Sequence, residues 1–143
     1  MNTEILIVED DVASTQAYQL LLNDMNYSSV AVRTLKEAEK VLNQENRFRI
    51  VLININLPDG NGLDLAEVLH RNGHVQAIMI SGHITTFLAK QFLPQLEGLR
   101  EVPVIEKPVQ LEEFQRTIKE AYERNGRYLE GKRQICSEGS VSA

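Results

Sequence analysis

The sequence predicts an α/β fold built on a doubly wound, five-stranded parallel sheet. Five short apolar runs are spread along the 143 residues, and each is continuous rather than alternating in polarity. Continuous apolarity indicates a strand that is buried on both faces, as in a parallel sheet. The segments between the runs repeat apolar residues at helical spacing. Alternating strands and helices favour right-handed βαβ units, with helices on both faces of the sheet.

The first part of the chain predicts a strand, a helix and a second strand. Ile5–Val8 is an apolar run that ends in three acidic residues. Apolar residues then recur at helical spacing over residues 13–25, and Asp11 or Ser14 is placed to cap the start of this helix. Val30–Val32 is a shorter second strand.

A capping box and a clear strand define the next section. Thr34 and Glu37 have the Thr-x-x-Glu form of a capping box, which predicts that a helix begins there. Ile50–Ile53 is the third strand. The Pro, Gly, Asn and Asp residues of Asn54–Gly62 predict a loop, and a helix is expected from Leu63 until Asn72-Gly73 stops it.

The last section predicts two more strands and two more helices. Ala77–Ile80 is the fourth strand, and helices are expected over 86–96 and 111–122. Val102–Ile105 is the fifth strand, which we place at a sheet edge because Pro103 cannot donate to a strand ladder. We expect one domain over residues 1–127 and a tail or linker stump over 128–143, where helical periodicity is lost.

Composition and charge exclude several classes of protein. The formal net charge of −5 argues against direct nucleic-acid binding, because neutralising phosphates needs clustered Lys and Arg. The single cysteine, Cys136, excludes an internal disulfide and a cysteine-based metal site. No apolar run is long enough to cross a membrane, and the N-terminus lacks the basic region of a secretory signal. We therefore expect a cytoplasmic protein with no membrane partner.

Polar residues follow four of the predicted strands, at the edge where a doubly wound sheet places its functional site. The stretches are Glu9-Asp10-Asp11, Asn54–Gly60, Ser81-Gly82-His83 and Glu106-Lys107-Pro108. Together they closely resemble the receiver domain of bacterial two-component response regulators, over about residues 4–124. The resemblance implies a flavodoxin-like sheet with strand order 2-1-3-4-5. It also implies a signalling module rather than an enzyme.

The resemblance implies a metal site and a phosphoryl site. Glu9 and Asp10 match the acidic pair that holds Mg²⁺, and Asn56 matches the position whose backbone carbonyl completes the metal shell. Ser81 matches the hydroxyl residue that binds the phosphoryl group, and Lys107 matches the lysine that pairs with its oxygens.

The lysine of the family is followed by a proline in a cis peptide bond. Pro108 matches that position, so a cis Lys107–Pro108 bond is expected from the resemblance.

One residue departs from the family pattern at the phosphoacceptor itself, where Asn54 stands in place of aspartate. The acceptor must be an ionised carboxylate that attacks phosphorus, and a carboxamide is a poor nucleophile. Asn54 also removes a negative charge from the metal shell, so Mg²⁺ binding is expected to be possible but weakened. The fold is expected to survive, because the two side chains have nearly the same shape.

A second departure concerns the surface through which the family transmits its state. Three positions before Lys107 the family usually has Tyr or Phe, a ring that swings inward, whereas this chain has Val104. The segment between Ser81 and Lys107 is also a few residues longer than usual. This chain therefore departs from the family in two parts of the usual signalling face.

Three functions remain open. The first is a receiver-like module that is not phosphorylated at Asn54 and acts through contacts with a histidine kinase, another signalling protein or a second copy of itself. The second is an ordinary phosphoaccepting regulator whose aspartate was replaced by asparagine, artificially or in one lineage. The third, an aspartate-type phosphatase, is disfavoured because Asn54-x-Asn56 stands where that class needs Asp-x-Asp. A flavin site is also disfavoured, because the turn after the first strand is acidic.

Two acidic residues near the site have ordinary structural interpretations. Asp59 lies in a Pro-Asp-Gly turn, where turn geometry alone favours aspartate. Asp11 is better explained as a helix cap than as a metal ligand.

Overall fold

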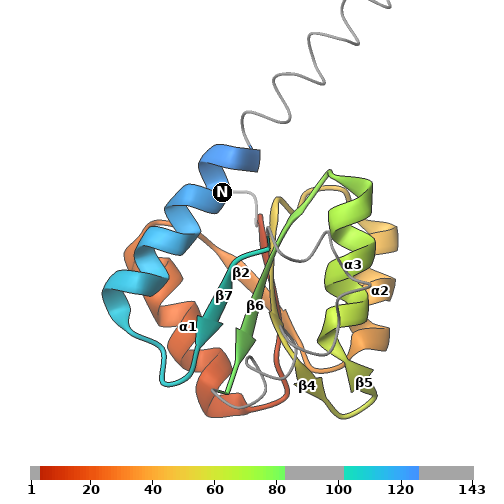
Figure 1. The fold of residues 1–143 in the computed structure, drawn as a ribbon, viewed down its shortest axis with the longest axis horizontal. Coiled ribbons are helices and arrows are strands. Elements are labelled where there is room, and N and C mark those ends of the chain that lie inside the picture. The colour runs from red at the N-terminus through yellow and green to blue at the C-terminus, as the bar shows by residue number, and fades with distance from the viewer. Residues whose placement is uncertain (1–3, 83–101, 126–143) are drawn as a thin grey trace, which may run out of the picture.

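The computed structural model describes residues 4–82 and 102–125, and its centre is a five-stranded parallel sheet (Figure 1). The strand order is β2-β1-β3-β6-β7, which is the predicted 2-1-3-4-5 order once a separate hairpin, β4 and β5, is left out of the count. The strands of the sheet are β1 (Ile5–Val8), β2 (Ser29–Val32), β3 (Ile50–Asn54), β6 (Gln76–Ser81) and β7 (Val104–Glu106). The predicted fold class is confirmed.

Helices cover both faces of the sheet, as a doubly wound fold requires. Helix α1 (Val12–Asp24) and a helix over residues 111–125 lie on one face, and α2 (Leu35–Gln44) and α3 (Gly62–Asn72) lie on the other (Figure 1). Alternate residues of each strand therefore point into two separate cores. Ile50 and Leu52 belong to the core under α1, whereas Val51 and Ile53 belong to the core under α2 and α3. This explains why the strands are continuously apolar.

The helix starts agree with the caps expected from the sequence. The side chain of Asp11 accepts a hydrogen bond from the Ser14 N–H at 2.9 Å and is the N-cap of α1. Thr34 is the N-cap of α2 and accepts from the Glu37 N–H at 3.1 Å. The Glu37 carboxylate reaches back to the Arg33 N–H rather than to the Thr34 N–H. One half of the predicted capping box is therefore formed as expected.

Two predicted boundaries were wrong. The loop expected over Asn54–Gly62 contains a small antiparallel hairpin, β4 (Asn56–Leu57) and β5 (Gly60–Asn61), because a Pro-Asp turn lets the chain fold back on itself. The last strand begins at Val104 rather than Val102, so Pro103 precedes it, and the Pro103 carbonyl accepts the Met79 N–H at 2.9 Å. The edge position of this strand is nevertheless confirmed.

Some expectations fall on residues outside the described ranges. These are the helix over 86–96, the length of the segment before residue 102, and the tail over 128–143. Among the described helices, none is long and apolar enough to cross a membrane.

Candidate functional site

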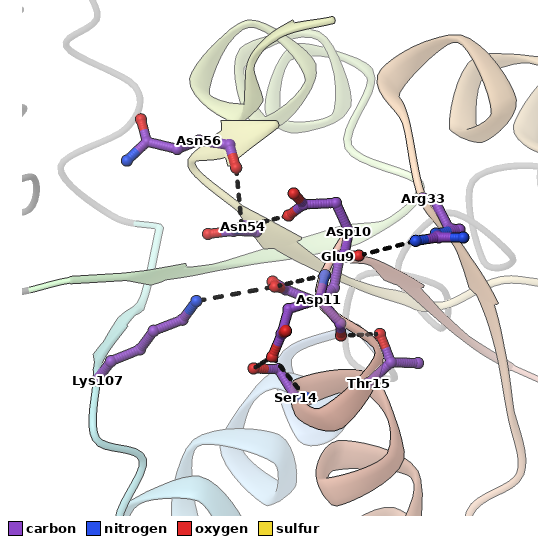
Figure 2. Close-up of polar contacts among 9 residues, drawn as sticks. All are labelled: Glu9, Asp10, Asp11, Ser14, Thr15, Arg33, Asn54, Asn56 and Lys107. Carbon is purple, nitrogen blue, oxygen red and sulfur yellow. Dashed lines mark hydrogen bonds and ion pairs between the residues drawn. The ribbon is translucent and has the colours of Figure 1, made fainter. Parts of the chain in front are cut away.

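The polar stretches that follow the strands in sequence meet at the carboxyl edge of the sheet. Glu9 and Asp10 follow β1, Asn54 is the last residue of β3, and Lys107 follows β7 (Figure 2). Parallel register sets this arrangement, because Val8 pairs with Ile53 and Asn54 pairs with Ile80. We call Glu9, Asp10, Asn54 and Lys107 the carboxyl-edge pocket.

Glu9 is the most deeply buried carboxylate of the carboxyl-edge pocket, with 2 % of its surface exposed. Its Oε1 lies 3.8 Å from the Lys107 Nζ and accepts the Asp11 N–H at 3.3 Å. Its Oε2 is buried without a hydrogen-bond partner among the described residues. Burial raises the pKa of Glu9, and the positive charge of Lys107 opposes that rise. Glu9 is thus a buried acceptor that one half-exposed lysine only partly satisfies.

Asn54 uses the nitrogen of its carboxamide, not the oxygen, toward the acidic side of the pocket. Its Nδ2 donates to the Asp10 Oδ1 at 3.3 Å and to the Asn56 carbonyl at 2.9 Å (Figure 2). Both partners are acceptors only, so this is the orientation that hydrogen-bond chemistry requires. An amide donor therefore lies between two of the oxygens that the resemblance assigns to a metal ion.

Lys107 and Ser81 lie at the far side of the site, where β6 and β7 end. The Lys107 N–H donates to the Ser81 carbonyl at 2.7 Å, and the Lys107–Pro108 peptide bond is cis. The side chain of Lys107 extends toward Glu9 (Figure 2). Ser81 is almost fully buried, and its hydroxyl donates to the Gly82 carbonyl at 2.8 Å. Val104 begins β7 and packs against the core under α2 and α3.

The donor set fits Mg²⁺ in its chemistry but is already satisfied in part. The Glu9 and Asp10 carboxylates and the Asn56 carbonyl are the oxygen ligands that Mg²⁺ prefers, and Glu9 has an oxygen without a partner among the described residues. Asp10 and Asn56, however, accept hydrogen bonds from Asn54. A cation that used these oxygens would compete with the Asn54 amide N–H groups, which already donate to them. No group of three His, Cys, Asp or Glu side chains in the described part of the chain could hold a metal.

Backbone packing fixes the end of β3 against the start of α3. A Cβ atom at Gly62 would clash with the Asn54 carbonyl oxygen and would lie 2.7 Å from the Ile53 Cγ2, so only glycine lets α3 begin there. The Gly62 N–H donates to the Ile55 carbonyl at 2.7 Å. The position of Asn54 is therefore set by backbone contacts on both sides of the hairpin.

The role of Asp59 could not be predicted from the sequence. Its carboxylate accepts the N–H groups of Leu35 and Lys36, at the start of α2, at 2.9 and 3.0 Å. The Pro-Asp-Gly pattern correctly indicated a turn, but nothing in it indicated a partner 24 residues earlier in the chain.

Comparison with known proteins gives one consistent result. The family model described as "Response regulator receiver domain" matches residues 5–119. The phyllosphere-induced regulator PhyR of Methylorubrum extorquens is 33% identical over 90 residues, which cover 62% of this chain and 34% of PhyR. This chain thus aligns with about a third of the length of that relative.

Two further proteins are similar over most of this chain. The polar-differentiation response regulator DivK of Brucella anthropi is 26% identical over 119 residues, covering 83% of this chain and 95% of DivK. The solution structure of the beryllofluoride-activated NtrC4 receiver domain dimer has a TM-score of 0.71 and 26% identity. The match covers 85% of this chain and 98% of that one.

Proposed function

This chain belongs to the response regulator receiver domain family, and from this premise we propose that it is a receiver that takes no phosphoryl group at position 54. It acts in two-component signalling through protein–protein contacts. We propose that it is not an enzyme in its own right. The single observation that carries the proposal is the state of Asn54 in the carboxyl-edge pocket.

Asn54 has neither the charge nor the orientation of a nucleophile. An attacking residue needs an ionised oxygen aimed at phosphorus, as an aspartate supplies. Here the carboxamide is neutral, and its Nδ2 donates to Asp10 and Asn56. The same bonds support a weakened affinity for Mg²⁺, because the amide N–H groups compete with the ion for these oxygens.

The rest of the proposed site supports descent from a working receiver. Glu9 and Asp10 are the proposed metal residues, with the backbone carbonyl of Asn56. Ser81 and Lys107 are the proposed phosphoryl-binding residues. When bound, Mg²⁺ would supply positive charge for phosphoryl transfer at this site. Lys107 supplies positive charge next to Glu9 without a metal.

The proposed partners are signalling proteins of the same pathway. A histidine kinase or another cytoplasmic signalling protein is the first candidate, since that is the context of the family. A homodimer is the second, because the similar NtrC4 structure is that of a receiver domain dimer. Val104, with no aromatic ring to swing, supports an output that does not depend on the usual ring movement.

The near-complete pocket also supports a second candidate function. With Glu9, Asp10, Ser81 and Lys107 all present, an aspartate at position 54 would complete an ordinary phosphoaccepting receiver. The codon for residue 54 in the source gene separates a natural asparagine from an introduced one.

Phosphorylation is tested with a small-molecule phosphodonor and Mg²⁺ on two proteins, the parent chain and the Asn54→Asp variant. We expect no label on the parent and a measurable label on the variant, because only the variant has a carboxylate nucleophile. A stoichiometric, base-labile phosphoryl group on the parent would refute the proposed function. An unlabelled variant would instead show that the pocket has lost more than its nucleophile.

A further inference from the structure

The β4–β5 hairpin carries one residue of the site and one residue of a distant contact. Asn56, in β4, presents its carbonyl to the Asn54 Nδ2 at 2.9 Å. Asp59, in the turn of the same hairpin, accepts the backbone N–H groups of Leu35 and Lys36. Only Leu57 and Pro58 therefore separate Asn56, which contacts the carboxyl-edge pocket, from Asp59, which is attached directly to α2.

The hairpin is held as a small unit. Asn56 pairs with Asn61, and Leu57 pairs with Gly60. Gly60 packs so closely on α2 that a Cβ atom there would lie 3.0 Å from the Leu35 Cδ1, and its φ of +153° is one that favours glycine. If the turn residues moved relative to α2, the paired strands of the hairpin would move with them, and the Asn56 carbonyl in β4 would be displaced.

Asp59 is not the residue that caps α2 within its own segment. Thr34 is that cap, and it accepts the Glu37 N–H. The N–H groups of Leu35 and Lys36 are two of the four that have no acceptor inside a helix, and Asp59 supplies acceptors for both. These bonds hold the pKa of Asp59 below its ordinary value. The geometry of the turn alone does not require these two hydrogen bonds, so they point to a second role for Asp59.

We propose that Asp59 is a positioning residue of the carboxyl-edge pocket, which fixes the Asn56 carbonyl against Asn54 by fastening the hairpin to the N-terminus of α2. The pocket and α2 are coupled as a result, so that a change at Asn54 alters the first turn of α2. Coupling of this kind acts in both directions. The inference rests on the proposed function only in treating this pocket as the site whose state matters.

The structure offers a matched pair of variants for the test. Asp59→Ala and Thr34→Ala each remove a side-chain acceptor from the first turn of α2, but only Asp59 belongs to the hairpin. Both are made in the full chain. The readouts are amide hydrogen exchange of Leu35 and Lys36, and the NMR signals of the Asn54 side-chain NH₂, assigned by their absence in Asn54→Ala.

We expect Asp59→Ala to speed exchange at Leu35 and Lys36 by about fivefold to tenfold, the change that follows loss of a helix cap. The same variant should shift the Asn54 side-chain signals, whereas Thr34→Ala should leave them in place. In the reverse direction, Asn54→Ala should also speed exchange at Leu35 and Lys36, because the hairpin has lost its contact in the pocket.

Two results would overturn the inference. One is an unchanged Asn54 signal in Asp59→Ala, and the other is an equal shift in both cap variants, which would indicate general loosening. If Asp59→Ala does not fold, Asp59→Asn retains one acceptor oxygen and is measured in the same way against Thr34→Ala. None of these readouts involves phosphate, so phosphorylation of the parent chain would refute the proposed function and leave this inference standing.

Discussion

The two edges of the sheet carry polar clusters that differ in how completely their buried groups are hydrogen-bonded. At the amino edge, Arg49 donates to the Asn125 Oδ1 at 2.7 Å, lies 4.2 Å over the Tyr122 ring and pairs with Glu4 at 3.8 Å. Asn125 is buried and also donates to the His74 carbonyl. We call these residues the amino-edge cluster. At the carboxyl edge, Lys107 and Glu9 are 3.8 Å apart, and Glu9 keeps one oxygen unpartnered among the described residues.

This difference is one of hydrogen-bond satisfaction, and it predicts opposite contributions of the two clusters to stability. Satisfied buried polar groups stabilise and fix one arrangement, whereas a partly satisfied buried carboxylate costs stability. The amino-edge cluster joins β1, β3 and the helix over 111–125, so it is a structural clamp. The carboxyl-edge pocket contains a partly satisfied buried carboxylate, Glu9, which lowers the stability of the folded chain.

The amino-edge cluster should give the largest loss of stability when it is broken. Arg49→Ala removes the donor to buried Asn125 and the cation over Tyr122, so we expect the free energy of unfolding to fall by about 2–4 kcal/mol. Arg47→Ala is the control, because Arg47 is exposed and, in the described part of the chain, contacts its neighbours Glu45 and Phe48. Its loss should be below about 1 kcal/mol in the same urea titrations. Equal losses in the two variants would contradict the structural role of the amino-edge cluster.

A smaller effect is expected at the carboxyl edge when Glu9 loses its counter-charge. We expect Lys107→Ala to lower the free energy of unfolding by about 1–3 kcal/mol, because a buried carboxylate is left without its cation. The double variant with Glu9→Gln should lose less than Lys107→Ala alone, since no charge is then stranded. If the loss in the double variant equalled the sum of the losses in the two single variants, Lys107 would not stabilise Glu9.

Asn54→Asp should lower the stability of the carboxyl-edge pocket and so increase the difference in stability between the two edges. In the absence of metal we expect a loss of about 1 kcal/mol, because a second carboxylate faces Asp10 and two donated hydrogen bonds disappear. Mg²⁺ should then raise the melting temperature of the variant more than that of the parent, at matched ionic strength. Equal Mg²⁺ shifts would mean that the Asn54 amide does not hinder the metal.

The smallest effect concerns the pH dependence contributed by Asp59. Its pKa is lower in the folded chain than its ordinary value of 3.8, so its contribution to stability is complete above pH 3.8 and disappears as pH falls through the folded pKa. The melting-temperature gap between the parent and Asp59→Ala should stay constant from neutral pH down to pH 3.8 and then narrow. The corresponding gap for Thr34→Ala should not change with pH, because threonine does not titrate. If the melting-temperature gap for Asp59→Ala did not change with pH, the charge of Asp59 would make no contribution to stability.

Most of the fold and much of the candidate site followed from local patterns. Continuous apolar runs located the strands, and Asp11 and Thr34 marked the starts of two helices. Parallel strands bring their carboxyl ends to one edge, which is why Glu9 and Lys107 could be expected to meet. The boundary errors fell at residues 54–62, where two very short strands pair locally in a hairpin, and at 102–104, where the start of the edge strand depends on pairing with β6.

By itself, the sequence determined the fold class, the strand order through its family resemblance, and the identity of the residue at position 54. Only the tertiary structure decided how the polar groups are paired. Asn125 lies 76 residues from Arg49, and Asp59 lies 24 residues from Leu35. The orientation of the Asn54 amide likewise depends on Asp10, 44 residues away. The physical reason is that periodicity and capping act within a few residues, whereas a hydrogen bond depends on distances that exist only after the chain has folded.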